Sequence, residues 1–178
     1  MYESMEAGRR FIPLLPIMAR LDGRSFSKFT KGMDRPFDKI MSSCMIDTTI
    51  ALVKNTGACM GYTQSDEITL AWHSTDIRSQ IWFDGRIAKM TSQLAAQATL
   101  IFYRLIAERM PAYANRMPTF DARLWNVPNQ TEGANVFVWR EWDATKNSLS
   151  MAASAFYSHK ELMNKGGAQK HDMLFAKG

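Results

Sequence analysis

Cysteine and long hydrophobic runs are both scarce in this chain, and each shortage excludes a class of protein. Cys44 and Cys59 are the only two cysteines in 178 residues, and they have no paired metal-ligand spacing. We therefore expect reduced thiols in a cytoplasmic protein rather than a disulfide framework. The longest apolar stretch, residues 11–19, contains Pro13 and Pro16 and is too short to span a bilayer. We expect no membrane segment, and no secretory signal is evident at the start.

Several catalytic signatures are also missing. His73, His159 and His171 are scattered, so they give no His-x-x-x-His pattern for zinc. The chain has no Gly-x-Ser-x-Gly elbow, no Walker loop and no dinucleotide-binding glycine fingerprint. It also has no internal repeat and no low-complexity tract. These absences argue against zinc hydrolases, α/β-hydrolases, P-loop NTPases and Rossmann dehydrogenases.

The overall composition is that of an ordinary globular protein. Hydrophobic residues make up 46% and charged residues 22% of the chain, which is long enough for one domain with a full core or for one domain plus an appendage. Lys and Arg number 22 against 17 Asp and Glu, giving a formal net charge of +5. This basic excess suits a polyanionic partner, but it is too modest to decide the function.

The order of predicted elements points to one fold class. Apolar residues recur every three or four positions over residues 36–57 and 86–110, which predicts two helices. The whole order is βαββαβ followed by further helix, as in a ferredoxin-like α+β fold, with an antiparallel sheet and its helices on one face. The predicted strands are residues 14–21, 58–63, 68–72 and 119–127, and a last helical region covers residues 132–160.

This topology predicts that two distant carboxylates meet. The first and third strands of the fold are antiparallel neighbours, so Asp22 and Asp66 should lie at the same edge of the sheet. Two carboxylates repel unless a cation lies between them, and oxygen ligands alone suit Mg²⁺. Gly23 would let the backbone approach and offer its carbonyl to the ion. The alternative is that Asp22 belongs to an ordinary turn and Asp66 to a loop tip.

Basic and aromatic residues support an anionic ligand without requiring one. A polyphosphate would explain the cations after Asp22 and at the start of the second helix, although for any single lysine a solvated face is the more common explanation. Three tryptophans could stack on bases, although core packing is the more common use of such residues. The cations are Arg24, Lys28, Lys31, Arg35, Arg86, Lys89, Lys146 and Lys170, and the tryptophans are Trp125, Trp139 and Trp142.

Five blocks of sequence give a more specific indication. They are RLDGRSF at 20–26, GYTQSDE at 61–67, FDGRIAKMTS at 83–92, PTFDAR at 118–123 and DATKNS at 143–148. In these blocks the sequence resembles the tRNA-His guanylyltransferase family, and in particular its guanylyltransferase-like 3′–5′ polymerase branch. The resemblance implies a palm like that of polymerases and nucleotidyl cyclases. It also implies addition of nucleotides to the 5′ end of tRNA, after ATP or GTP has activated that end.

The resemblance also implies roles for individual residues. Asp22 and Asp66 would be catalytic and, with the Gly23 carbonyl, would hold two Mg²⁺ ions. Glu67 would contact these ligands without binding the ions itself. We expect a palm over residues 1–130, a helical extension packed on it over residues 131–178, and a homotetramer. The nucleotide-binding set would be Asp22, Gly23, Arg24, Ser25, Phe26, Ser27, Arg35, Ser65, Asp66, Arg86, Lys89, Asp143, Asn147 and Lys170.

Two departures from the family pattern bear on the reaction. Eukaryotic members carry His-Ile-Asn-Asn-Leu-Tyr-Asn where this chain has TKNSL at 145–149, which favours the 5′-end repair branch. Ser27 stands where many relatives have histidine, and relatives usually continue past position 178 with a basic segment that we expect this chain to lack. A non-catalytic RNA-binding palm and a nucleotidyl cyclase remain as alternatives.

Overall fold

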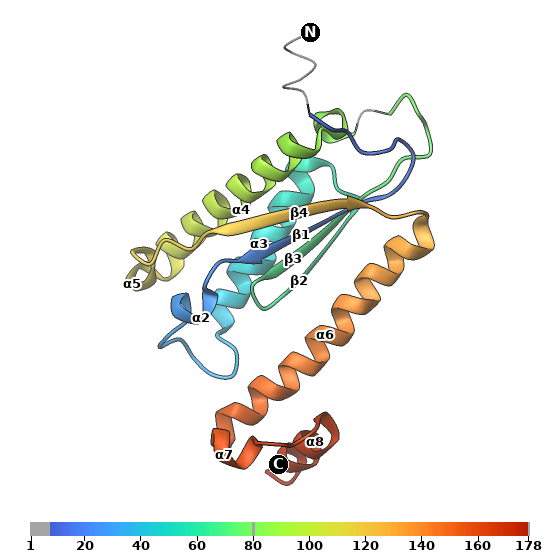
Figure 1. Ribbon diagram of the computed structural model, residues 1–178. Coiled ribbons are helices and arrows are strands. Elements are labelled where there is room, and N and C mark those ends of the chain that lie inside the picture. Colours follow the sequence, from blue (N-terminus) through green and yellow to red (C-terminus); the bar gives the residue numbers. More distant parts are fainter. Residues whose placement is uncertain (1–7, 80, 178) are drawn as a thin grey trace.

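The computed structural model describes residues 8–79 and 81–177, and its strands form one antiparallel sheet in the order β2-β3-β1-β4 (Figure 1). This order and the succession of elements confirm the α+β, ferredoxin-like prediction. The strands are β1 (Ile17–Gly23), β2 (Met60–Gln64), β3 (Glu67–Trp72) and β4 (Phe120–Asn126). The helices are α2 (Phe26–Phe29), α3 (Lys39–Thr56), the 3-10 helix η1 (Trp82–Gly85), α4 (Ile87–Arg109), α5 (Pro111–Ala114), α6 (Gln130–Phe156), α7 (His159–Leu162) and α8 (Gly167–Phe175).

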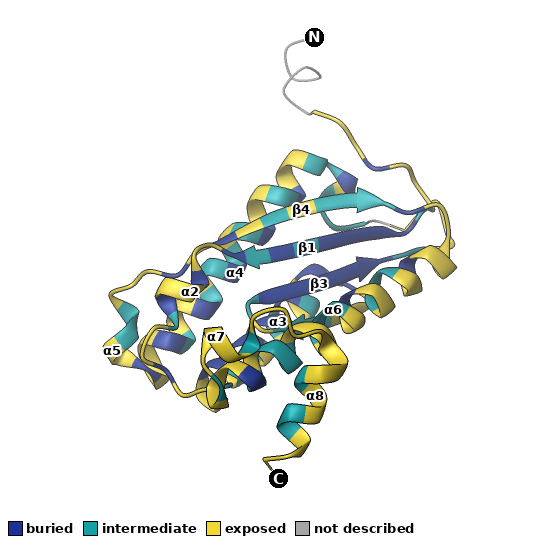
Figure 2. Cartoon of the chain, turned by 60° about the horizontal axis from the view of Figure 1, so that its bottom comes forward, coloured by how far each residue is buried: buried dark blue, intermediate teal, exposed yellow. Residues whose placement is uncertain are grey.

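One face of the sheet forms the main core with α3 and α4. Alternate residues of a strand point to the same face, and Ile17, Ala19 and Leu21 of β1 are fully buried against these two helices. On α4, residues such as Leu94 and Phe102 recur on one side and are also fully buried. Figure 2 shows β1 and β3 as the most deeply buried strands of the molecule. The hydrophobic period of the two helices therefore places them on the sheet.

Helix α6 lies on the other face of the sheet. It leaves the end of β4, and its Val136 and Phe137 pack with Met18 and Ala71, which alternate with the core residues of their strands. Beyond this contact α6 runs on to α7 and α8, and Figure 1 shows these three helices away from α3 and α4. No helix among the described residues is long and apolar enough to cross a membrane.

Most element boundaries differ from the sequence prediction by one or two residues, and three differences are larger or have a clear physical cause. The helix expected from residue 36 begins at Lys39, because the Asp38 carboxylate accepts hydrogen bonds from the Ile40 and Met41 amides at 2.9 Å each. The first strand begins at Ile17 rather than at residue 14, because Leu14 has a φ of 65°, which is incompatible with a strand. The last helical region breaks after residue 156 into α7 and α8.

The loop expected after Asp22 contains a helix that the sequence did not reveal. Helix α2 is a single turn, and its Phe26 and Phe29 are buried. Their rings lie 5.0 Å apart, and the Phe26 ring lies 5.5 Å from Phe102 of α4 and 5.2 Å from Phe120 of β4. This aromatic cluster fixes the chain immediately after Asp22 to the core.

Candidate functional site

The pairing of β1 with β3 brings Asp22 and Asp66 together. Asp22 is in register with Glu67 at the end of β1, and the Gly23 amide donates to the Asp66 carbonyl at 3.1 Å. Ser65 and Asp66 form the two-residue connection between β2 and β3, so the carboxylate of Asp66 stands at the tip of a hairpin. The two residues therefore meet at one edge of the sheet, as the topology predicts.

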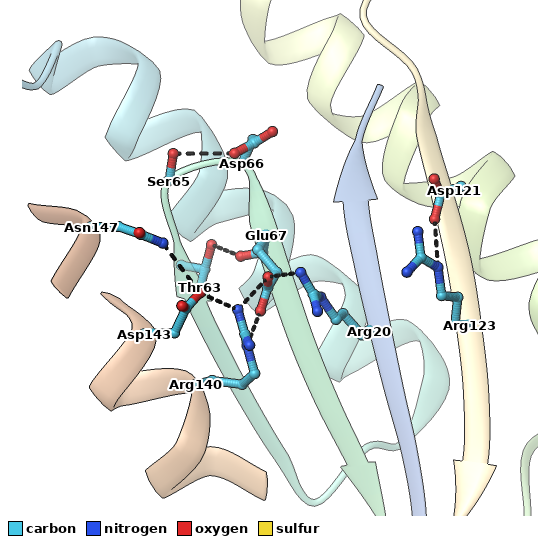
Figure 3. Close-up of polar contacts among 10 residues, drawn as sticks. All are labelled: Arg20, Thr63, Ser65, Asp66, Glu67, Asp121, Arg123, Arg140, Asp143 and Asn147. Carbon is cyan, nitrogen blue, oxygen red and sulfur yellow. Dashed lines mark hydrogen bonds and ion pairs between the residues drawn. The ribbon is translucent and has the colours of Figure 1, made fainter. Parts of the chain in front are cut away.

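Asp66 lies in surroundings that disfavour its negative charge. Burial is the main cause that raises the pKa of the Asp66 carboxyl, and the nearby charges of Asp22 and Glu67 raise it further. Hydrogen bonds from its own backbone and from Ser65, whose hydroxyl donates to Oδ1 at 3.1 Å, act in the opposite direction (Figure 3). A cation at this edge would remove the repulsion, so the carboxylate pair favours a bound positive ion.

The tight packing at Gly23 explains why a glycine follows Asp22. A Cβ atom built at this position would lie 2.3 Å from Cδ2 of the Phe26 ring, closer than any side chain can approach. The glycine therefore lets Phe26 fold back over the strand end and join the aromatic cluster. The sequence suggested close approach to a ligand, and the structure shows close approach of an aromatic ring.

The backbone after Asp22 offers some of the amides expected for a phosphate site. The amides of Gly23 and Arg24 are already used, since they donate to the carbonyls of Asp66 at 3.1 Å and of Thr119 at 2.9 Å. Within the described part of the chain, residues 25–27 have no acceptor for their amides. These three N–H groups at the start of α2 are free to donate to an anion.

A groove of about 880 Å³ opens beside the carboxylate pair. One wall is the end of β1, the hairpin tip and α2, and the facing wall is α6. The segment of residues 30–38 also lines it, and the positive charges of Lys31 and Arg35 there stand beside the carboxylates of Asp34 and Asp38. The sequence-predicted site residues that line it are Asp22, Phe26, Ser27, Arg35, Ser65, Asp66, Glu67, Asp143 and Asn147.

Glu67 is held by two arginines on the face of the sheet that α6 covers. Its side chain is 7% exposed, and Arg20 Nη2 lies 2.6 Å from Oε2. Arg140 of α6, only 3% exposed, donates through Nε to Oε1 at 2.5 Å and through Nη2 to Oε2 at 2.8 Å (Figure 3). Both oxygens of Glu67 are therefore occupied, and the residue is better placed to hold α6 than to bind an ion.

Arg140 also orders the groove-facing residues of its own helix. Its Nη2 donates to Asp143 Oδ2 at 2.8 Å, and the Asn147 amide donates to the same oxygen at 3.1 Å. Asp143 and Asn147 thus stand across the groove from the hairpin tip in an arrangement fixed through Arg140 and Glu67. Arg20 and Arg140 had no role in the sequence prediction, because nothing in a strand or amphipathic helix marks a particular arginine as buried.

Several predicted nucleotide-binding residues lie elsewhere. Arg86 and Lys89 are at the opposite end of the sheet, because β3 runs away from the carboxylates to Trp72, whose ring stacks on Trp82 of η1 at 6.5 Å. The Lys89 ammonium lies over the Phe83 ring, 4.7 Å from its centroid. The structure therefore does not bring this helix start to the carboxylate pair. Gly23, Arg24 and Ser25 lie outside the groove lining, and Lys170 lines a neighbouring groove.

The donor set at the sheet edge fits Mg²⁺ better than other metals. No group of three or more His, Cys, Asp or Glu side chains able to hold a metal occurs among the described residues, which argues against a complete protein cage such as zinc requires. Mg²⁺ is commonly held by one or two carboxylates, with substrate phosphates and water completing its coordination. Asp22 and Asp66 match that pattern.

The sheet order, the carboxylate pair at its edge and the groove beside it define a palm-type α+β domain. Comparison with known families gives the same assignment, because residues 1–128 match the family described as tRNAHis guanylyltransferase. The chain belongs to this family.

Individual relatives are similar over most of the chain. An uncharacterised protein of Acanthamoeba polyphaga mimivirus is 32% identical, over 75% of this chain and 53% of its own length. The tRNA(His) guanylyltransferase of Schizosaccharomyces pombe is 26% identical, over 99% of this chain and 70% of its own length. The chain thus spans between about half and 70% of the curated relatives it matches.

Solved structures agree with this placement. A bacterial tRNA(His) guanylyltransferase-like protein in complex with ATP superimposes with a TM-score of 0.92 at 33% identity, covering 99% of this chain and 77% of that one. A structure with the same description in complex with GTP gives a TM-score of 0.82 at 34% identity, covering 89% and 75%. The sheet, its covering helices and α6 are therefore a shared architecture.

Proposed function

We propose that this protein is a Mg²⁺-dependent nucleotidyltransferase that adds nucleotides to the 5′ end of tRNA in the 3′–5′ direction. The observation that carries the proposal is the pairing of β1 with β3, which sets Asp22 beside Asp66 at the margin of a groove. Membership of the tRNAHis guanylyltransferase family supports the same reaction. The ATP and GTP complexes of bacterial relatives support nucleoside triphosphates as substrates.

In the proposed reaction the 5′-monophosphate of the tRNA attacks the α-phosphorus of ATP or GTP, and pyrophosphate leaves. The 3′-hydroxyl of the incoming nucleotide then attacks the activated 5′ phosphorus and displaces the nucleoside monophosphate. A tRNA that begins with a 5′-triphosphate needs only the second attack, which releases pyrophosphate. Both steps are displacements at a phosphorus atom, and the negative charge on its oxygens must be stabilised.

Each side of the groove has a task in this scheme. Asp22 and Asp66 would hold Mg²⁺, with the Gly23 carbonyl as a further oxygen ligand. Bound there, the metal supplies positive charge to the phosphoryl oxygens and orients them. The free amides of Phe26 and Ser27, which line the groove, would donate to triphosphate oxygens, with the Ser25 amide beside them. The Ser65 hydroxyl would turn from Asp66 to the same oxygens, and Arg35 would neutralise part of their charge.

The far wall of the groove is suited to orienting the nucleotide. Asp143 and Asn147 face the carboxylate edge from α6 and present hydrogen-bonding groups to it. Asp143 Oδ2 already accepts from Arg140, so the pair is fixed before a ligand enters. We assign these two residues to positioning the sugar or base of the bound nucleotide.

The test is an extension assay with Mg²⁺, all four nucleoside triphosphates and a tRNA that lacks its first 5′ nucleotide. We expect growth at the 5′ end that follows the opposite strand, which is 5′-end repair. Asp22→Asn and Asp66→Asn should each lower the rate on the order of a thousandfold, because loss of metal-mediated charge stabilisation costs several kcal/mol. One guanosine added regardless of template would instead indicate maturation of tRNA-His.

A matched control is Asp121→Asn. Asp121 is directly opposite Asp22 in the β1–β4 register, yet it lies outside the groove and pairs with Arg123 at 3.5 Å. This variant should keep its activity within a few-fold. Full activity of Asp22→Asn or Asp66→Asn would overturn the proposal. RNA binding without extension would indicate a non-catalytic palm, and a cyclic nucleotide formed without RNA would indicate a cyclase.

We also propose the remaining properties that the family resemblance implies. The palm would cover residues 1–130 and the helical extension residues 131–178, with α6 joined to the palm through Arg140 and Glu67. The protein would act in the cytoplasm as a homotetramer. Arg86 and Lys89 are remote from the carboxylates of their own chain. They would therefore bind either a nucleotide or tRNA held by another subunit of the assembly, or a part of the tRNA far from its 5′ end. Light scattering on the purified protein tests the tetramer.

A further inference from the structure

A second groove, of about 550 Å³, lies between α6 and the segment that begins α8. It is distinct from the carboxylate groove, although Ser150 of α6 lines both. Among the predicted site residues only Lys170 belongs to it. Its chemistry differs from that of the first groove, because its charged lining is mainly basic and it contains an exposed indole.

Trp142 is the central feature of the α6 wall. Its side chain is 68% exposed and lines the groove, with Lys146 one helical turn further along the same side. Trp139, one turn earlier, is 52% exposed, but the Arg140 guanidinium lies over its ring at 4.5 Å and it is outside both grooves. On this helix the Trp142 indole therefore faces a groove, whereas the Trp139 indole lies outside both grooves and has the Arg140 guanidinium over its ring.

The opposite wall adds further positive charge on an open backbone. Lys165 and Lys170 flank Gly166 and Gly167, and a Cβ atom added at either glycine would meet nothing within 4 Å. The Lys170 ammonium lies 3.2 Å from the Ser150 hydroxyl, at the margin between the two grooves. Three lysines against the single acid Glu141 make this lining positive overall.

We propose that this groove holds unpaired RNA of the strand opposite the 5′ end that is being extended, with one base stacked on Trp142 and backbone phosphates on Lys146 and Lys165. The inference rests on the proposed function, because continuity through Ser150 matters only if the RNA end lies in the carboxylate groove. An aromatic face beside lysines is the usual platform for single-stranded RNA, since any base can stack and every phosphate is negative. Lys170 then lies where the strand passes from one groove to the other.

The first measurement is the dissociation constant for a 5′-phosphorylated tRNA lacking its first nucleotide, by fluorescence anisotropy at fixed salt. Trp142→Ala should weaken binding about fivefold to a hundredfold, the range found for loss of one base–aromatic stack. The double change Lys146→Glu with Lys165→Glu should weaken it at least about tenfold and flatten the dependence on salt. The matched controls are Trp139→Ala and Lys160→Glu, which alter the same helical region outside both grooves.

A second measurement separates this inference from the proposed function. Stabilisation of the protein by GTP with Mg²⁺, followed as a thermal shift, should persist in the Trp142 and lysine variants. Conversely, Asp66→Asn should keep its affinity for RNA while it loses extension. If extension fails in the wild-type protein but the Trp142 and lysine variants still lose RNA affinity, the second groove stands and the reaction does not.

Two results would overturn the inference. One is that Trp142→Ala and the double lysine variant bind the tRNA as tightly as the two controls do. The other concerns dextran sulfate, a polyanion without bases. The inference fails if dextran sulfate competes with the tRNA and Trp142→Ala weakens the binding of neither polyanion. That outcome would show a general positive surface with no base-stacking platform.

Discussion

At the scale of a single residue, Gly23 lies where any larger side chain would meet the ring of Phe26. Gly23→Ala must displace that ring from the aromatic cluster or move the end of β1. We expect a loss of about 1–3 kcal/mol in the free energy of unfolding, as for overpacked sites. Urea unfolding measures it, with Gly167→Ala as the control, because an added Cβ there meets nothing. Equal stability of the two variants would contradict this account of Gly23.

A second prediction about single residues concerns Asp66 and Asp76, whose pKa values shift in opposite directions. Burial raises the pKa of Asp66 above the usual 3.8, so its charge destabilises the metal-free fold, and this cost vanishes as the pH falls through the raised value. Hydrogen bonds from Arg78 lower the pKa of Asp76, so its charge stabilises the fold above pH 3.8, and this gain is lost as the pH falls through the lowered value.

The prediction follows from these signs. In a chelator at pH 7, Asp66→Asn should be more stable than the wild type, and the difference should shrink as the pH falls toward 4. Asp76→Asn should be slightly less stable than the wild type at pH 7, with the difference again shrinking in acid. Thermal unfolding at several pH values provides the measurement. An Asp66→Asn variant that is less stable at pH 7 without metal would show that the carboxylate is well accommodated in the empty fold.

At the scale of elements, the position of α6 depends on the ion pair between Arg140 and Glu67. Removing one partner of a buried pair leaves the other charge uncompensated, which costs about 3–5 kcal/mol. Because Arg20 still neutralises Glu67, we expect Arg140→Met to fall at the lower end of that range. A double-mutant cycle with Glu67→Gln in urea measures the coupling, and the double variant should recover part of the loss.

Arg140→Lys is the matched control for this pair. It keeps the positive charge but loses the two parallel hydrogen bonds, so its stability should lie between wild type and Arg140→Met. Under the proposed function, Arg140→Met should also raise KM for the nucleotide more than it lowers kcat, because Asp143 and Asn147 lose their fixed position. A coupling energy near zero would mean that α6 is held by its other contacts.

The way the elements pair and cross explains what the sequence could and could not predict. The meeting of Asp22 and Asp66 was predictable, because the order of elements fixes which strands pair. The ends of paired strands can then be placed without knowing how any side chain packs. The link from Glu67 to Arg140 was not, because it joins residues 73 positions apart through the crossing of a helix over a sheet. Helix α2 was missed since four residues are too few to show a helical period.

At the scale of the whole molecule, stability is divided unevenly between the sheet and the C-terminal helices. Helices α3 and α4 bury a continuous core on the sheet, whereas α7 and α8 contain no buried residue among those described, as Figure 2 shows by their exposed surfaces. Contacts such as the hydrogen bond from the Tyr157 hydroxyl to the Met173 carbonyl, 2.6 Å, hold α8 against α6. Local opening of α8 should therefore require far less free energy than unfolding of the sheet.

Native-state hydrogen exchange on the full chain tests this division of stability. Amides in the middle of α4 should exchange only through global unfolding and those of α8 through local opening, so their protection should differ on the order of a thousandfold or more. Because α8 forms one wall of the second groove, tRNA should slow exchange in α8 in the wild-type protein, and Trp142→Ala should reduce that slowing. Equal protection of α4 and α8 in the free protein would mean that α8 opens only when the whole domain unfolds. The second groove would then be rigid before tRNA binds, and tRNA would not be needed to order it.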